Sequence, residues 1–195
     1  SSSGAGAVAM GPTANASGLA GVAVGIQSKA SNNYTTAIGS VATADKDYAT
    51  AIGGKASATS EGAQALGYQS NASGYQSNAI GTQAAASDYQ SNAIGTQAAA
   101  SGIASNAIGA QAAASGIASN AIGWNAGATA HDATAIGSGA KASGIASDAI
   151  GWNAEATAQD ATAIGSGAKA YSRSGIAMGT NAEAGSKGSE DTLVQ

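Results

Sequence analysis

The residues that could carry out acid-base or metal chemistry are few and scattered along the chain. His131 is the only histidine, and Gln159 takes its place one 28-residue block later. A histidine that acts as a general base needs a substrate within reach and a partner that orients it, and the pattern supplies neither. Asp45 and Asp47 flank Lys46, but no D-x-D-x-D calcium loop occurs. We therefore predict no enzyme activity, no catalytic residue, no metal site and no cofactor.

The composition argues against further classes of function. The chain has no cysteine, so it cannot form disulfides or thiolate metal sites. Only 9% of its residues are charged and the net charge is −4, whereas a nucleic-acid surface needs clustered Lys and Arg. No apolar run is long enough to cross a bilayer. We expect neither nucleic-acid binding nor membrane contact by this segment.

Aromatic residues recur in equivalent sequence contexts, which suggests a surface. Tyr68, Trp124 and Trp152 each directly follow an Ala-aliphatic-Gly run, and Tyr75 and Tyr89 each begin the same run, Tyr-Gln-Ser-Asn-Ala-Ile-Gly. Partly exposed rings can anchor a protein or glycan ligand. Rings that only stack along a repeat, or pack against a partner chain, would show the same pattern. These five residues are the candidate ligand surface.

A 14-residue repeat must position these side chains. Ala, then an aliphatic residue or Met, then Gly recurs thirteen times without an insertion, from Ala9-Met10-Gly11 to Ala177-Met178-Gly179. A coiled coil would need two apolar seam positions in every heptad, which the repeat lacks. A disordered tract would not need unbroken register. Stacked coils do need it, so we predict a parallel β solenoid with two short strands and two turns per coil.

The second strand of each coil indicates which side faces water. Its middle position holds Lys141 and Glu155 in two of the coils. Successive residues of a strand point to opposite faces, so the flanking alanines, Ala112 and Ala114 for example, must point inward. A coil this short leaves room only for small residues between its two sheets.

The same rule orients the first strand, such as residues 105–109. A small-residue interior places Ser105, Ala107 and Gly109 inside and Ile108 outside. The opposite orientation would bury polar residues such as Asp148 in a dry interior, which is costly. We favour the small-residue interior.

This orientation leaves an apolar stripe on the outside of the coils. A long exposed apolar stripe marks an interface, and a core of Ala and Gly gives a lone chain little stability. We therefore predict a homo-oligomer; the stripe would be buried equally well in a dimer or a trimer. The predicted interface consists of Met10, Val24, Ile38, Ile52, Leu66, Ile80, Ile94, Ile108, Ile122, Ile136, Ile150, Ile164 and Met178.

Runs such as Ser105-Asn106-Ala107-Ile108-Gly109 and Thr35-Thr36-Ala37-Ile38-Gly39 resemble the S-V-A-I-G core of YadA-like heads in trimeric autotransporter adhesins. The resemblance extends over residues 4–185. It implies an all-β, left-handed parallel β-roll of about thirteen 14-residue coils, assembled as a homotrimer. It also implies display on the surface of a Gram-negative outer membrane, with the family's stalk and membrane anchor missing from this segment.

Where the family has Val, this sequence often has a polar residue, as at Gln64, Asn78, Asn92, Thr134 and Asp148. In a trimer of the family's kind these residues would lie near the axis, in hydrogen-bonded ladders or around water. The departure means that collagen binding in particular does not carry over from the resemblance.

The resemblance implies an adhesin head that attaches to host extracellular matrix or to a cell-surface protein or glycan, and that promotes autoaggregation. The alternative is a structural spacer that projects another adhesive domain from the outer membrane. Residues 1–185 form the predicted head. Residues 186–195 break the repeat and are interpreted as a cap, the start of a neck or a disordered end.

Overall fold

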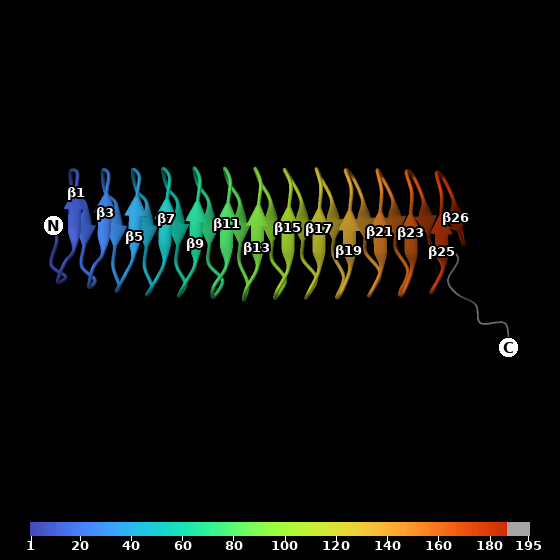
Figure 1. Cartoon of the computed structure of the whole chain (residues 1–195), viewed down its shortest axis with the longest axis horizontal. Helices are drawn as coiled ribbons and strands as arrows, with labels where there is room; N and C mark the ends of the chain where they lie inside the picture. The colour runs from blue at the N-terminus through green and yellow to red at the C-terminus, as the bar shows by residue number, and fades with distance from the viewer. Residues whose placement is uncertain (187–195) are drawn as a thin grey trace. The chain divides into compact units, whose positions relative to one another are not determined.

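The computed structural model describes residues 1–186 and places two strands in every 14-residue repeat (Figure 1). The chain divides into two compact units, Ser1–Ala100 and a second that begins at Ser101. Both units are parallel β solenoids, and together the repeats make about thirteen turns. The predicted all-β solenoid is confirmed.

The first unit contains two parallel sheets. One consists of the three-residue strands β1 (Val8–Met10), β3 (Val22–Val24), β5 (Thr36–Ile38), β7 (Thr50–Ile52), β9 (Gln64–Leu66), β11 (Asn78–Ile80) and β13 (Asn92–Ile94). The other consists of the two-residue strands β2 (Asn15–Ala16), β4 (Lys29–Ala30), β6 (Thr43–Ala44), β8 (Ser57–Ala58), β10 (Asn71–Ala72), β12 (Ala85–Ala86) and β14 (Ala99–Ala100).

The second unit repeats this arrangement. Its three-residue strands are β15 (Asn106–Ile108), β17 (Asn120–Ile122), β19 (Thr134–Ile136), β21 (Asp148–Ile150), β23 (Thr162–Ile164) and β25 (Ile176–Met178). Its two-residue strands are β16 (Ala113–Ala114), β18 (Gly127–Ala128), β20 (Lys141–Ala142), β22 (Glu155–Ala156), β24 (Lys169–Ala170) and β26 (Glu183–Ala184). None of the described residues forms a helix that could span a membrane.

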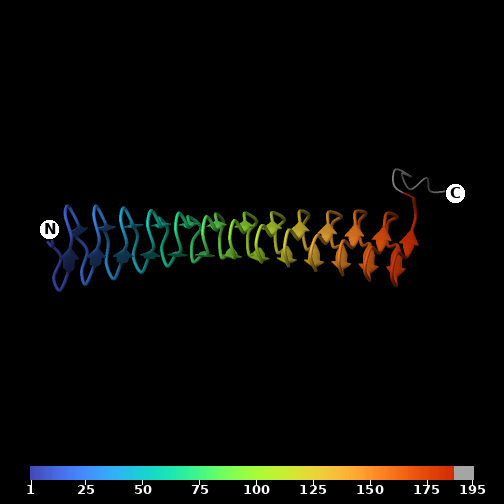
Figure 2. The same ribbon diagram turned by 90° about the horizontal axis from the view of Figure 1, so that it is seen from above.

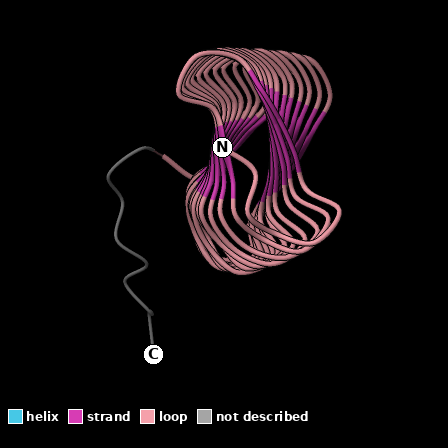
Figure 3. Ribbon diagram, turned by 90° about the vertical axis from the view of Figure 1, so that its left-hand side faces the viewer, coloured by secondary structure: helices cyan, strands magenta, loops and turns pink. Residues whose placement is uncertain are grey.

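The register follows the sequence repeat without a slip. Each residue of a strand pairs with its equivalent in the next repeat, as Ala107 does with Ala121 and Ile108 with Ile122. Within each unit the two columns of strands can be followed from coil to coil in Figure 2, and Figure 3 shows them facing each other with turns at both ends. Equivalent residues of successive coils therefore form columns, and neighbouring residues in a column are about 4.8 Å apart.

Each coil is built from two similar halves of seven residues. In both halves the chain reverses through a residue in the left-handed region, such as Gln83 and Gln90 with φ of 57° and 52°. A backbone hydrogen bond closes each turn, from Ala84 N to Gly81 O (3.3 Å) and from Ser91 N to Asp88 O (3.2 Å). The repeat predicts the turns, but the division of each coil into two halves of seven residues becomes visible only in the backbone.

The interior contains only small side chains. Ser105 and Ala107 are fully buried, whereas Ile108 keeps 38% of its surface exposed. Ala112 and Ala114 of the facing sheet are also fully buried. The predicted small-residue interior is thus confirmed, with the isoleucine outside.

Gly109 is the exception, because it is half-buried rather than inside the coil. Its φ is 133°, a region that only glycine readily adopts. A Cβ added there would lie 2.5 Å from the carbonyl oxygen of Gly123 in the next coil. The glycine column therefore serves the close approach of neighbouring backbones, and its predicted place in the interior was wrong.

Candidate functional site

Two columns of side chains share the outer face of the three-residue strands. In β15 and β17 they are Ile108 and Ile122, each 38% exposed, and the residues two positions earlier, Asn106 and Asn120. The same pattern runs through the first unit, where Ile80 and Ile94 are exposed to the same extent. Within each unit, the predicted interface residues therefore form a continuous outward stripe beside a column that is mostly polar.

Side-chain hydrogen bonds connect the polar column from coil to coil. The side-chain amide of Asn78 donates to Oδ1 of Asn92 at 2.7 Å. In the same way, the side-chain amide of Asn106 donates to Oδ1 of Asn120 at 2.9 Å. Two steps of such a ladder are therefore present within the chain, and one of them joins two of the residues expected to form it, Asn78 and Asn92. These hydrogen bonds satisfy half-buried amides that would otherwise weaken an interface when they lose water.

Asp148 belongs to the same column. It lies between Thr134 and Thr162 of the adjacent strands and is half-buried. The carboxylate therefore stands on the face that carries the apolar stripe.

The candidate aromatic residues occupy turns, and the structure brings some of them together. Tyr75 and Tyr89 stack with ring centroids 5.3 Å apart and planes 9° from parallel. Trp124 and Trp152 are 58% and 61% exposed, and the intervening coil has Ser138 at their position. Tyr68 is also exposed, in the first unit.

The rings therefore form separate small platforms rather than one patch. Tyr34 and Tyr48, which lie outside the candidate set, form a second stack at 5.3 Å with planes 7° from parallel. An exposed ring pair offers a large apolar face with polar hydroxyl groups at its edge, which suits contact with a protein or a sugar.

The candidate chemistry residues lie apart from one another. The His131 side chain is 52% exposed, and its Nδ1 lies 2.6 Å from Oδ2 of the neighbouring Asp132. Asp45 pairs with Lys29 at 3.1 Å, and the Asp47 carboxylate accepts a hydrogen bond from the backbone N–H of Asn33. Across residues 1–186, no group of three or more His, Asp or Glu side chains could hold a metal ion. What the arrangement offers is contact surface.

The family of the chain follows from its repeats. The model of the YadA head domain repeat, which spans two copies, matches residues 2–28, 16–42, 30–56, 44–70, 58–84, 72–98, 128–154 and 156–182, well over half of the chain. The chain belongs to the YadA head family. Heads of this family are adhesin domains, typically non-enzymatic, and are exposed on the surface of the bacterial outer membrane. No curated protein matches the chain.

A solved YadA head has the same architecture. The chain is similar to the crystal structure of the collagen-binding domain of the Yersinia adhesin YadA, with a TM-score of 0.54 and 27% sequence identity. The match covers 65% of this chain and 73% of that chain. This YadA-like head is therefore homologous to that collagen-binding domain.

The sequence analysis missed further exposed apolar residues of this YadA head. Ile103, Ile117 and Ile145 occupy equivalent turns of the second unit and are exposed. The recurring run Gly-Ile-Ala-Ser, at residues 102–105, 116–119 and 144–147, was the signal that could have identified them. Of the predicted tail, residues 187–195 lie outside the described residues.

Proposed function

We propose that this chain is the ligand-binding head of a trimeric surface adhesin, which attaches a Gram-negative bacterium to host extracellular matrix or host cells. The single observation that carries the proposal is the run of YadA head repeats on a solenoid whose aliphatic stripe and most of whose aromatic rings are exposed in the described residues. The head is exposed at the bacterial cell surface. The outer face of the head also promotes autoaggregation between cells.

Assembly as a homotrimer buries the apolar stripe. Thirteen aliphatic or Met side chains, from Met10 to Met178, belong to the stripe, and soluble monomers rarely expose so extended an apolar surface. The support for three copies rather than two is the family resemblance, which also supports a left-handed roll. Light scattering of the purified chain should give three times the single-chain mass of 18.2 kDa. The mass of a single chain would contradict the proposal.

Attachment uses the exposed aromatic residues. Trp124 and Trp152 are exposed in turns of the second unit, just after β17 and β21. The related Yersinia domain binds collagen, which supports a matrix ligand for this chain without naming collagen as that ligand. Tyr68, Tyr75 and Tyr89 extend the same proposed surface in the first unit.

Binding of the purified chain to immobilised matrix proteins and to cultured cells tests attachment. The double variant Trp124→Ala/Trp152→Ala should lose most of the binding, because aromatic anchors carry a large share of interface free energy. Tyr48→Ala is the matched control, since it removes an exposed ring outside the proposed surface. If the assembled chain binds neither matrix nor cells, it is a spacer that projects another domain.

A further inference from the structure

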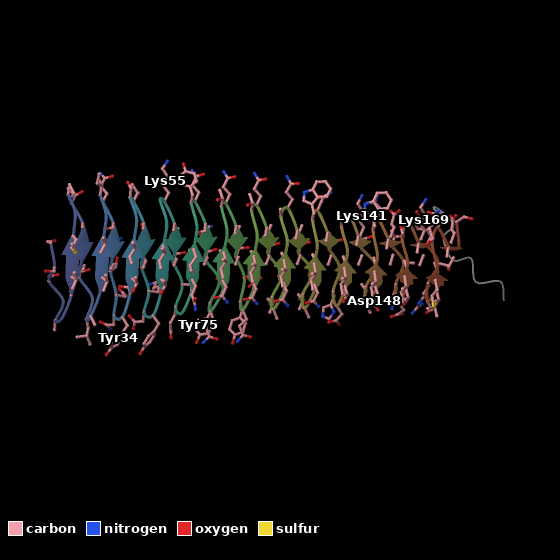
Figure 4. All side chains as sticks on the ribbon, turned by 45° about the horizontal axis from the view of Figure 1, so that its top comes forward. Tyr34, Lys55, Tyr75, Lys141, Asp148 and Lys169 are labelled. Carbon is pink, nitrogen blue, oxygen red and sulfur yellow. The ribbon has the colours of Figure 1, made fainter. Side chains whose placement is uncertain are left out.

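A groove lies on the outer face of the two-residue strands in the second unit, where Gly127 interrupts a column of side chains. Gly127 pairs with Ala113 on one side and Lys141 on the other. A Cβ added at Gly127 would meet nothing within 4 Å. The missing side chain therefore leaves open space above the sheet. Lys141, which lines this space, projects outward from the next coil (Figure 4).

The groove has a volume of about 260 Å³ and is partly open to solvent. Its apolar lining comes from Ala113, Ala126 and Gly127. A volume of this size is smaller than the ~300–1,000 Å³ of drug-sized pockets, and it suits a single small ring. Its polar walls are formed by Gln111, Asn125, Thr129, Lys141, Ser143 and Glu155.

The walls present hydrogen-bonding groups of every kind. The amides of Gln111 and Asn125 both donate and accept, as do the hydroxyls of Thr129 and Ser143. Lys141 donates and the Glu155 carboxylate accepts, and their opposite charges balance. A neutral molecule that carries several hydroxyl groups fits such a set better than an anion or a cation does.

A buried tyrosine supports Glu155. The Tyr171 hydroxyl donates to Oε2 of Glu155 at 2.8 Å, and only 9% of Tyr171 is exposed. Burial, and next the hydrogen bond to Glu155, raise the pKa of Tyr171 to about 12. The phenol therefore keeps its proton near neutral pH and holds the carboxylate, which lowers the entropic cost of ordering it on a ligand.

An exposed ring lies in the turn that supplies part of the wall. Trp124 directly precedes Asn125 and is 58% exposed. An indole offers a wide apolar face, against which the C–H face of a sugar ring can pack.

We propose that the groove at Gly127 binds one neutral sugar residue of a glycan, a hexose or an N-acetylhexosamine, with Gln111, Asn125 and Glu155 as its principal hydrogen-bonding partners. The inference rests on the proposed attachment function and deepens it by naming a ligand class and a site. A site this small binds a free monosaccharide with a dissociation constant on the order of millimolar.

The repeats of the chain themselves provide a substitution that should fill the groove, because another coil carries a larger residue at the position of Gly127. Residues 115–142 and 143–170 differ at only three positions, and one of the differences places Glu155 where the first block has Gly127. The backbone thus already accepts glutamate at this position of the coil. A second difference places Gln159 at the position of His131, so H131Q is a matched control in a turn, outside the groove lining.

Saturation-transfer NMR with free hexoses and N-acetylhexosamines tests the proposal on the complete chain. At least one sugar should give signals with the wild-type chain and with H131Q, and the signals should fall at least about tenfold with G127E, a loss of at least about 1.4 kcal/mol. Circular dichroism should show that G127E keeps its β structure. Absence of sugar signals with the wild-type chain, or signals that persist with G127E, would overturn the inference.

This test is separate from the test of attachment. Binding of free sugars in solution does not depend on matrix or cells, so a chain that binds sugar without attaching refutes only the attachment function. A chain that attaches equally well with and without G127E, and binds no sugar, refutes only the groove.

Discussion

Two glycines of one coil provide a direct test of what the glycine column does. Gly123 follows β17 and has a φ of 134°, and a Cβ there would lie 2.6 Å from the Gly137 carbonyl oxygen of the next coil. Gly127, four positions later, lies in β18 and faces open space. Replacing each by alanine adds the same methyl group to the same coil, with opposite consequences.

The cost at Gly123 can be worked out from two contributions. An alanine held at this φ costs about 1–3 kcal/mol. To relieve the contact with Gly137 the coils must separate, which weakens the 2.8 Å hydrogen bond from Gly137 N to Ile122 O and adds about 1 kcal/mol. Gly123→Ala should therefore lower the free energy of unfolding by about 2–4 kcal/mol. Gly127→Ala should raise it by about 0.5–1 kcal/mol, because it restricts the unfolded chain.

Urea unfolding followed by far-ultraviolet circular dichroism measures both changes. The protein concentration must be equal in all samples, because the midpoint of an oligomer depends on it. Amide hydrogen exchange adds a local measure, since repeat arrays can open in blocks. Exchange in the coils that join at Gly123 should accelerate in Gly123→Ala alone. Equal destabilisation by the two variants would refute the assignment of the glycine column to close backbone contact.

Three further predictions concern the stripe, a buried tyrosine and a strained turn. Ile122→Asp should abolish the oligomer in light scattering because it puts a charge on the stripe, whereas Ile117→Asp, in an exposed turn, should leave the mass unchanged. The pKa of Tyr171 is raised from 10.0 to about 12, so its neutral form stabilises the fold fully below pH 10 and this contribution is lost as the pH rises towards 12. Alkaline unfolding curves of Tyr171→Phe should lack that loss. Val41 is a β-branched residue at a φ of 60°, so Val41→Asn should raise the unfolding midpoint by relieving about 1 kcal/mol of strain.

The sequence predicts the coil and its side-chain orientation because the repeat occurs thirteen times, so the residue types at each position of the coil can be compared. One coil alone would not reveal which of Ala107 and Ile108 is buried. The lysines and glutamates aligned with Lys141 mark the outside, and the pleat then orients every other position. Between the two end coils, the structure agrees at these positions except in the glycine column.

The rest could not be predicted because it depends on backbone geometry between coils. The place of Gly109 outside the interior follows from a positive φ and from the distance to the next coil, neither of which alternation along a strand encodes. The groove at Gly127 is a missing side chain, so it becomes visible only when the residues of the neighbouring coils are placed around it. The stacked pair Tyr75 and Tyr89 was predictable, since a column places equivalent residues about 4.8 Å apart.

The two nearly identical blocks, residues 115–142 and 143–170, show how such a head can change its surface while it keeps its fold. Their three differences are Asn120 against Asp148 beside the stripe, Gly127 against Glu155 in the groove, and His131 against Gln159 in a turn. None of these six residues is buried. Because the interior has room only for side chains as small as Ala, Ser or Thr, change is confined to the outer columns, where the proposed assembly and the proposed ligand contacts lie. A thin core therefore leaves specificity and association to different outer columns, which can change independently of each other and of the fold.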